Sequence, residues 1–202
     1  SAPASAQSVR EGGGVFRIVA QARYAAAAAP AGAQQGGSNI DTATGTGFLV
    51  SGRRIVVTNN HVVALFRENN GQRTQPEAVA HGIFILRNGK PVLIRARPIA
   101  TLPEKDLALL EASEDLPGTP ITLADYDPER DTEVEAIGYP GVADPAILAN
   151  RRDGDDLPPA LLLPIKTQGR LQRIFDVTNL AVGSTPSRLS ARVIQHSAPI
   201  AP

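Results

Sequence analysis

Residues 83–95 read Ile83-Phe84-Ile85-Leu86-Arg87-Asn88-Gly89-Lys90-Pro91-Val92-Leu93-Ile94-Arg95. The Asn88-Gly89 dipeptide readily takes the positive φ angles of a tight type I′ turn, which joins two antiparallel strands. The apolar runs at 83–87 and 91–95 on either side of it have the length and composition of strands. This stretch therefore predicts a β-hairpin.

Similar apolar runs recur along the chain. Residues 47–51 and 54–58 flank Gly52-Arg53 and predict a second hairpin. Because the runs are short, separated by turn residues and almost free of helical periodicity, they favour an all-β fold built as a barrel or a sandwich. Single strands are expected at the remaining runs, which are 15–19, 107–111, 133–137, 165–174 and 192–196.

The composition excludes several classes of protein. The 202 residues are 42% hydrophobic but only 4% aromatic, so the core is expected to consist of Val, Ile, Leu and Ala. Twenty basic and twenty acidic residues give a formal net charge of zero, which argues against a nucleic-acid partner. The longest apolar runs, at 25–29 and 160–163, are far shorter than the roughly 18 to 20 residues of a membrane-spanning helix.

The absence of Cys and Met carries further information. Without Cys, these residues hold no disulfide, thiolate metal site or cysteine nucleophile. Without Met, the chain lacks an initiator, and Ala4-Ser5-Ala6 before Gln7 has the small-x-small form of a signal-peptidase site. We therefore expect an exported protein, either periplasmic or secreted.

The organisation of the chain follows from where composition changes. Residues 22–44 are rich in Ala, Gly and Gln and suit a long loop, whereas 142–164 suits an exposed charged insertion. The polar stretch 125–131 is a plausible crossing between two units. The expected segments are a poorly ordered arm at 1–14, a first unit at 15–125 and a second unit at 126–202.

Two short motifs carry the chemistry. His61 lies in Thr58-Asn59-Asn60-His61-Val62-Val63, and Asp106 follows in Lys105-Asp106-Leu107-Ala108-Leu109-Leu110. A His that takes a proton and an Asp that orients its ring form the acid/base half of a catalytic triad. The alternative readings are a helix-capping Asn-His turn for His61 and an exposed loop carboxylate for Asp106.

Five motifs together resemble the trypsin-like serine proteases, most nearly the bacterial branch that includes the HtrA/Deg family. The resemblance covers residues 15–202 and implies two six-stranded antiparallel β-barrels with the active site between them, the second barrel being incomplete in this chain. It implies a serine endopeptidase acting on peptide or protein substrates, with His61 as general base and Asp106 as its partner. The motifs are 45–50, 58–63, 106–110, 137–141 and 193–202.

The family's nucleophile motif, Gly-Asn-Ser-Gly-Gly, would be expected just after Pro202. We therefore expect no nucleophile within this chain, little activity of the chain alone, and a C-terminal fragment or second chain that completes the barrel. None of the serines at 184, 187, 190 and 197 has the glycine-flanked context of a nucleophile. Two alternatives remain open: a non-catalytic protease-like domain that binds peptides or proteins, and a cysteine nucleophile beyond the chain.

The other two histidines are given no catalytic role by the sequence. His81 is expected in a loop before a strand, and His196 on a strand leading toward the active-site cleft. No His-x-x-x-His spacing or carboxylate cluster predicts a metal site, so neither a metal nor a cofactor is expected.

Overall fold

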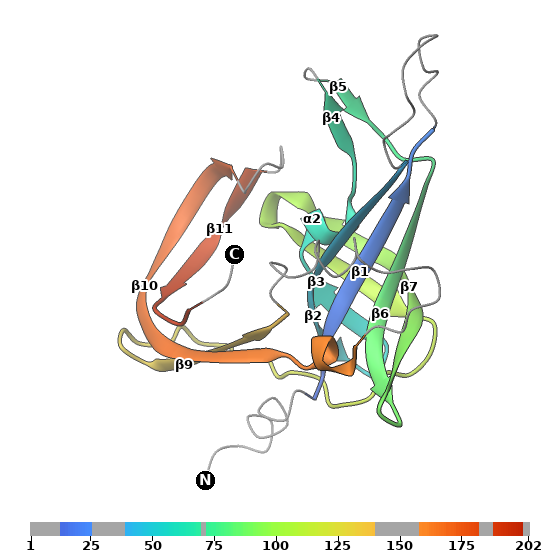
Figure 1. Ribbon diagram of the computed structural model, residues 1–202. Helices are drawn as coiled ribbons and strands as arrows, with labels where there is room; N and C mark the ends of the chain where they lie inside the picture. Colours follow the sequence, from blue (N-terminus) through green and yellow to red (C-terminus); the bar gives the residue numbers. More distant parts are fainter. Residues whose placement is uncertain (1–12, 26–38, 70–71, 140–157, 182–187, 200–202) are drawn as a thin grey trace.

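The chain folds into a closed six-stranded barrel joined to a three-stranded antiparallel sheet, with a small two-stranded arm beside the barrel (Figure 1). The structure is a computed structural model that describes residues 13–25, 39–69, 72–139, 158–181 and 188–199. The strand order around the barrel is β1-β2-β3-β8-β7-β6, and every neighbouring pair is antiparallel. The expected all-β fold is confirmed.

The elements have the following bounds. The barrel strands are β1 (Val15–Arg23), β2 (Ile40–Ser51), β3 (Ile55–Thr58), β6 (Ala78–Arg87), β7 (Lys90–Leu102) and β8 (Leu107–Ala112). The three-stranded sheet contains β9 (Glu133–Gly138), β10 (Ile165–Ala181) and β11 (Arg188–His196), and the arm contains β4 (Arg67–Asn69) and β5 (Gln72–Thr74). The short helices are α2 (Asn60–Val63), η1 (Pro103–Lys105) and η3 (Pro159–Leu162). Among the described residues, no helix is long and apolar enough to cross a membrane.

The predicted hairpin at 83–95 is confirmed. Asn88 and Gly89 have φ angles of 53° and 73°, and Arg87 pairs with Lys90 across the turn. Two consecutive positive φ angles are the property for which Asn-Gly is selected in a type I′ turn. The second predicted hairpin is confirmed as well, with Gly52 at φ 55° between β2 and β3.

The barrel core is aliphatic, as the composition predicts. Its members alternate along the strands because successive side chains of a strand point to opposite faces. Full burial of one such side chain stabilises the fold by about 1.5–3 kcal/mol, so the interior of the barrel is the main source of its stability. Completely buried members include Ile18, Leu49, Val56, Ile83 and Leu110.

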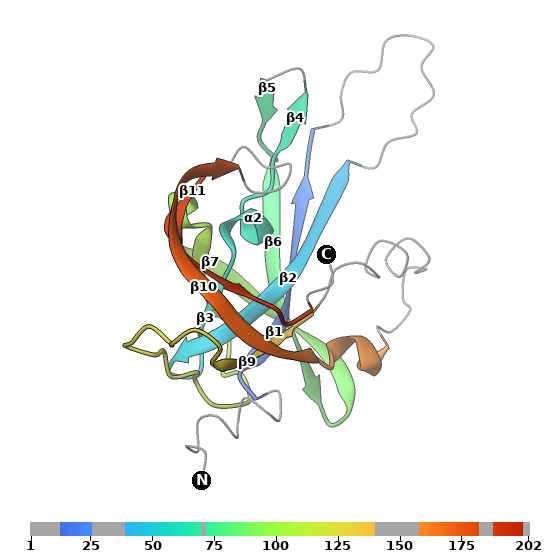
Figure 2. The same cartoon turned by 90° about the vertical axis from the view of Figure 1, so that its left-hand side faces the viewer.

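The second sheet is open in the described part of the chain. Its order is β11-β10-β9, and Figure 2 shows β10 as a long curved strand that carries β11 alongside the barrel. Phe175 and Ile194 on this sheet are 36% and 50% exposed. The sheet is a partial counterpart of the closed barrel, consistent with a two-barrel fold of the chymotrypsin type.

The predicted loop at 22–44 is wrong at both ends. β1 continues to Arg23 and β2 begins at Ile40, pairing in register from Val15 with Phe48 to Arg23 with Ile40. The Ala and Thr residues of these strand ends have weak strand patterns of their own, but Ala20 and Ala22 are fully buried. Burial therefore extends β1, and pairing with β1 extends β2, whose residues 40–44 are exposed or half-buried. Residues 26–38 lie outside the described residues.

Three smaller expectations also need correction. His81 lies within β6 rather than in a loop, paired with Ala20 on one side and Ala96 on the other. Gly14, assigned to the arm, joins the fold because its carbonyl accepts a hydrogen bond from the Leu49 amide. The end of the predicted exposed insertion contains η3, whose Leu162 is buried, while 140–157 and 1–12 are outside the described residues.

Candidate active site

The barrel brings the two chemistry-bearing motifs together. β3 runs antiparallel to β8, with Thr58 opposite Ala108 and Ile55 opposite Glu111. The residues that follow β3 therefore meet the residues that precede β8 at the same end of the barrel. α2 starts directly after β3 and carries His61, whereas η1 leads into β8 and is capped by Asp106.

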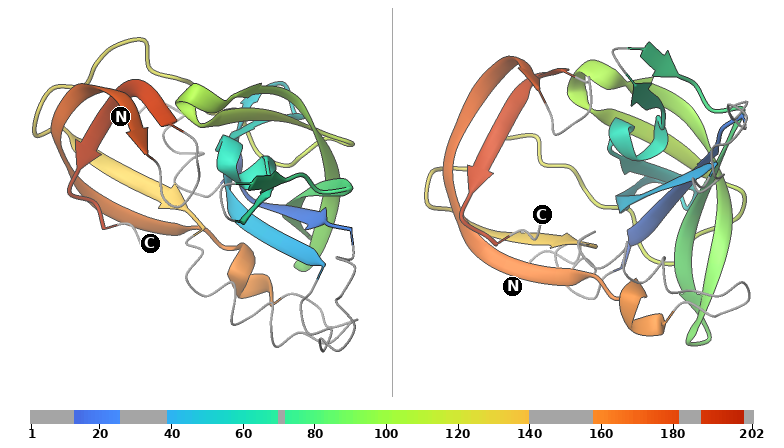
Figure 3. Two further views of the ribbon diagram at one scale, coloured as in Figure 1. Left: turned by 90° about the horizontal axis from the view of Figure 1, so that it is seen from above. Right: turned by 45° about the horizontal axis from the view of Figure 1, so that its top comes forward.

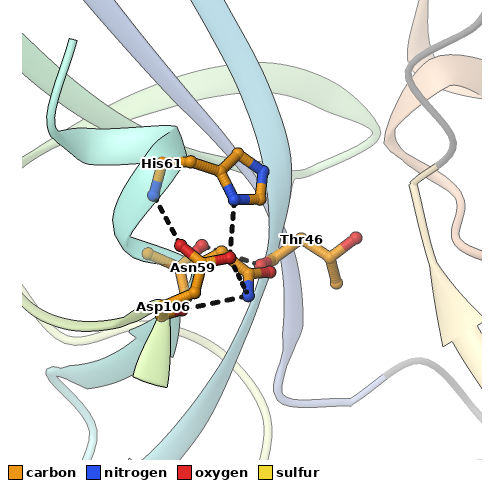
Figure 4. A network of polar contacts seen from close by, with 5 residues as sticks. Thr46, Asn59, His61 and Asp106 are labelled. Carbon is orange, nitrogen blue, oxygen red and sulfur yellow. Dashed lines mark hydrogen bonds and ion pairs between the residues drawn. The ribbon is translucent and has the colours of Figure 1, made fainter. Parts of the chain in front are cut away.

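His61 and Asp106 form a two-point contact (Figure 4). Nδ1 of His61 lies 2.7 Å from Oδ2 of Asp106, and the His61 backbone amide donates to Oδ1 at 2.9 Å. The carboxylate is an acceptor only, so the proton of this ring contact is on Nδ1. The Asp106 side chain is 8% exposed and that of His61 is 40% exposed, so the carboxylate is buried while the imidazole remains open to solvent.

The backbone of Asp106 is held in an unusual conformation. Its φ and ψ angles are 51° and 43°, in the left-handed region that Asp tolerates better than most residues. Its amide donates to the carbonyl of Pro103, and its own carbonyl accepts from the amide of Asn60 at 3.1 Å. The side-chain amide of Asn59 donates to the same carbonyl at 3.1 Å and to Oδ2 at 3.2 Å.

The Gly45-Thr46-Gly47 segment of β2 lies directly behind α2. A Cβ atom on Gly45 would lie 2.6 Å from Cγ2 of Val62, so glycine is needed for the helix to pack this closely on the strand. Thr46 accepts a hydrogen bond from the Thr58 hydroxyl at its carbonyl, at 2.9 Å. The segment thus sets the position of the helix that carries His61.

The sequence matches a known protein family. The family described as the trypsin-like peptidase domain matches residues 45–202, more than half of the chain. The chain belongs to the trypsin-like peptidase family. No curated protein sequence matches it.

Solved structures of this trypsin-like peptidase fold include proteases of the HtrA/Deg type. The active form of the Rv3671c protease from M. tuberculosis superposes with a TM-score of 0.58 at 18% identity, covering 96% of this chain and 63% of that one. Deg5 superposes with a TM-score of 0.54 at 16% identity, covering 96% of this chain and 73% of Deg5. The HtrA-type protease AlgW with a decapeptide superposes with a TM-score of 0.52 at 18% identity, covering 97% of this chain and 52% of AlgW. At these identities the likeness shows the fold, and the chain spans less than two thirds of the Rv3671c protease chain.

Tyr139, which follows β9, lies at the junction between the barrel and the second sheet, where it contacts β1 and η3. The single proton of its hydroxyl is shared between the carbonyls of Val15 and Leu162, which lie 3.3 and 3.1 Å from the hydroxyl oxygen. Burial raises the pKa of Tyr139 to about 12. The Arg17 guanidinium stacks 5.9 Å from its ring centre and donates to the carbonyl of Leu161 at 3.1 Å. Burial lowers the pKa of Arg17.

Several residues of this site were not assigned roles by the sequence. The sequence motifs contain Asn59, Thr46 and Tyr139, but only the tertiary contacts reveal what each side chain does. His81 contacts the end of α2, with its Nε2 3.0 Å from the carbonyl of Val63. A His on a strand gives no sequence signal for such a contact, because the carbonyl belongs to a segment 18 residues away.

The described serines of the second unit are engaged elsewhere. Ser190 accepts a hydrogen bond from the Asn179 amide, and Ser197 accepts one from the Arg170 amide. Ser184 and Ser187 lie outside the described residues. His196 ends β11, and its buried Nδ1 has no hydrogen-bond partner among the described residues.

Proposed function

We propose that this chain supplies the acid/base half of a serine endopeptidase that hydrolyses peptide bonds through a Ser-His-Asp triad. The observation that carries the proposal is the 2.7 Å contact between His61 Nδ1 and the buried Asp106 carboxylate. This contact selects the tautomer in which Nε2 is unprotonated and able to accept a proton. Among the described residues, the hydrogen bonds of His61 use its backbone amide and Nδ1 and leave Nε2 unengaged.

In the proposed reaction His61 acts first as general base and then as general acid. Nε2 takes the proton of the attacking serine hydroxyl as its oxygen adds to the scissile carbonyl carbon. The imidazolium so formed lies beside the Asp106 carboxylate, which stabilises its charge without taking the proton. His61 then returns the proton to the leaving amine as the peptide C–N bond breaks.

The nucleophile in this proposal lies beyond the chain, just after Pro202. The engagement of Ser190 and Ser197 with backbone amides supports this assignment, since a nucleophile must have its hydroxyl within reach of the base. We therefore propose that residues 1–202 alone are inactive, and that a C-terminal segment or a second chain covers the exposed side of the second sheet. Export to the periplasm or the medium is part of the same proposal.

Labelling with a fluorophosphonate probe tests the function. The parent protein is expected to take one equivalent of label on a serine downstream of residue 202, and residues 1–202 alone are expected to take none. Asp106→Asn, which leaves the wrong tautomer of His61, is expected to lower the kcat for a peptide substrate by about 10⁴-fold. A parent that binds peptides but neither takes label nor hydrolyses them would instead support the non-catalytic peptide-binding domain.

A further inference from the structure

Asn59 occupies the N-cap position of α2 but does not cap it. Its backbone is extended, with φ −76° and ψ 144°, and its side chain makes no capping hydrogen bond. Asn is among the residues most favoured at this position because its side-chain oxygen normally accepts from the second or third amide of the helix. The side chain of Asn59 is therefore committed to another task.

The capping acceptor is supplied by Asp106 instead. The amide of His61, the second residue of α2, donates to Oδ1 of Asp106 at 2.9 Å. The carboxylate thus meets the helix with one oxygen and the imidazole with the other. This arrangement leaves the Asn59 side chain free to use its amide nitrogen as a donor.

The Asn59 amide nitrogen donates to two atoms of the same residue. It reaches the Asp106 carbonyl at 3.1 Å and the carboxylate Oδ2 at 3.2 Å, as Figure 4 shows. Oδ2 is also the oxygen that accepts from His61 Nδ1. Asn59 therefore ties the main chain and the side chain of Asp106 together, next to the atom that orients the imidazole.

The backbone conformation and the burial of Asp106 explain why it needs the Asn59 donor. A non-glycine residue in the left-handed region costs about 1 kcal/mol or more unless surrounding contacts hold it. The carboxylate is also buried and charged, and such a group must be surrounded by donors to stay in place. The double donation from Asn59 meets both needs at once.

We infer that Asn59 is a positioning residue of the peptidase, which holds the Asp106 carboxylate in the place and orientation that His61 requires. The inference rests on the proposed function for its effect on catalysis. Its structural part, that the His61–Asp106 contact depends on the Asn59 donor, stands independently of the proposed function.

Two substitutions separate this role from ordinary packing. Asn59→Ala removes the donor. Asn59→Asp keeps the size of the side chain and a favoured N-cap residue, but replaces the donor by a carboxylate oxygen that faces Asp106. If Asn59 serves only local structure, Asn59→Asp should behave like the wild type, whereas a donor role predicts that it is at least as damaging as Asn59→Ala.

Asn88→Asp is the matched control for the added charge. Asn88 lies in the turn between β6 and β7 at φ 53°, where Asp-Gly fits as well as Asn-Gly. This variant adds the same negative charge to a turn away from the His61–Asp106 pair. It is expected to leave every measurement below unchanged.

The first readout is the NMR signal of the His61 Nδ1 proton in residues 1–202 labelled with ¹⁵N-histidine, assigned by its absence in His61→Gln. We expect a downfield, exchange-protected signal in the wild type and in Asn88→Asp, and its loss or severe broadening in both Asn59 variants. The amide signals of β1, β2 and β6, recorded on a uniformly ¹⁵N-labelled sample of each variant, should stay unchanged, which would show that the barrel is intact. Wild-type Nδ1 signals in both Asn59 variants would overturn the inference.

The second readout is kinetic and uses the parent protein. Both Asn59 variants are expected to lower kcat by about tenfold to hundredfold with KM little changed, because misplacement of a catalytic group impairs the chemical step. Unchanged kcat in both variants of an active parent would contradict the positioning role. A wild-type parent without activity would count against the proposed function alone, since the NMR signal still decides whether Asn59 holds the Asp106–His61 contact.

Discussion

The backbone amide of Tyr139 donates a hydrogen bond to the hydroxyl of Thr46 at 2.9 Å, across the junction between the second sheet and the barrel. Thr46 is also bonded to Thr58, two residues before Asn60 and the start of α2. Thr46 therefore links the end of β9, through its hydroxyl, to the strand that leads to His61, through its main-chain carbonyl. Figure 3 shows β9 beside the barrel, where it contacts β1 and β2.

Replacing Thr46 by Val should test this link. Val has the same shape but lacks the hydroxyl, so the Tyr139 amide loses its acceptor and the free energy of unfolding should fall by about 1–3 kcal/mol. Thr46→Ser, which keeps the hydroxyl, should retain most of that stability. Urea unfolding followed by circular dichroism measures both, and equal losses for Val and Ser would contradict a role for the hydrogen bond.

Gly45→Ala should displace α2. The added methyl group would overlap Cγ2 of Val62, at 2.6 Å, and overpacking of this kind costs about 1–3 kcal/mol. Shortening the opposing side chain with Val62→Ala removes the overlapping atoms. The double variant should therefore lose less stability than the sum of the single losses, as measured in a double-mutant cycle. Strict additivity would show that the close approach of Gly45 and Val62 does not matter.

Tyr139 should make stability fall in alkaline solution. Its folded-state pKa of about 12 exceeds the ordinary tyrosine value of 10.0, so the folded state keeps its proton where the unfolded state loses it. The Tyr139 contribution is then fully present below pH 10 and is lost as pH rises toward 12, at up to about 1.4 kcal/mol per pH unit. Tyr139→Phe should be less stable near neutral pH, because it loses the bonds to Val15 and Leu162, but should show a shallower decline above pH 10. Parallel pH profiles for the two proteins would rule out this contribution.

His81→Leu should loosen the end of α2. The variant removes the 3.0 Å contact to the Val63 carbonyl, and the loss of one such hydrogen bond typically costs about 1 kcal/mol. Hydrogen exchange of the Ala64 amide, which donates to the Asn60 carbonyl, reports on this helix. Faster exchange at Ala64 with unchanged exchange in β1 is the expected result, and uniform change across the barrel would point to a global effect instead.

The sequence alone determined the features that depend on neighbouring residues. Asn88-Gly89 specifies its turn through the φ angles that these two residues accept, so the hairpin is encoded locally. The motifs around His61 and Asp106 indicated the right family because their residue types and order are unusual together. His61 and Asp106 come together because β3 and β8 pair antiparallel. The strand patterns in the sequence allow this pairing but do not specify which strands are neighbours.

Only the tertiary structure decided the remaining features, because each depends on atoms that are distant in sequence. The strand ends around Ala22 form through burial and pairing, although their composition favours a loop. Asn59 turns from a helix cap into a donor because Asp106, 47 residues later, supplies the capping oxygen. Thr46 joins Tyr139 across 93 residues. Such contacts arise when the folded chain excludes water and its polar groups must find new partners, a requirement that local sequence cannot express.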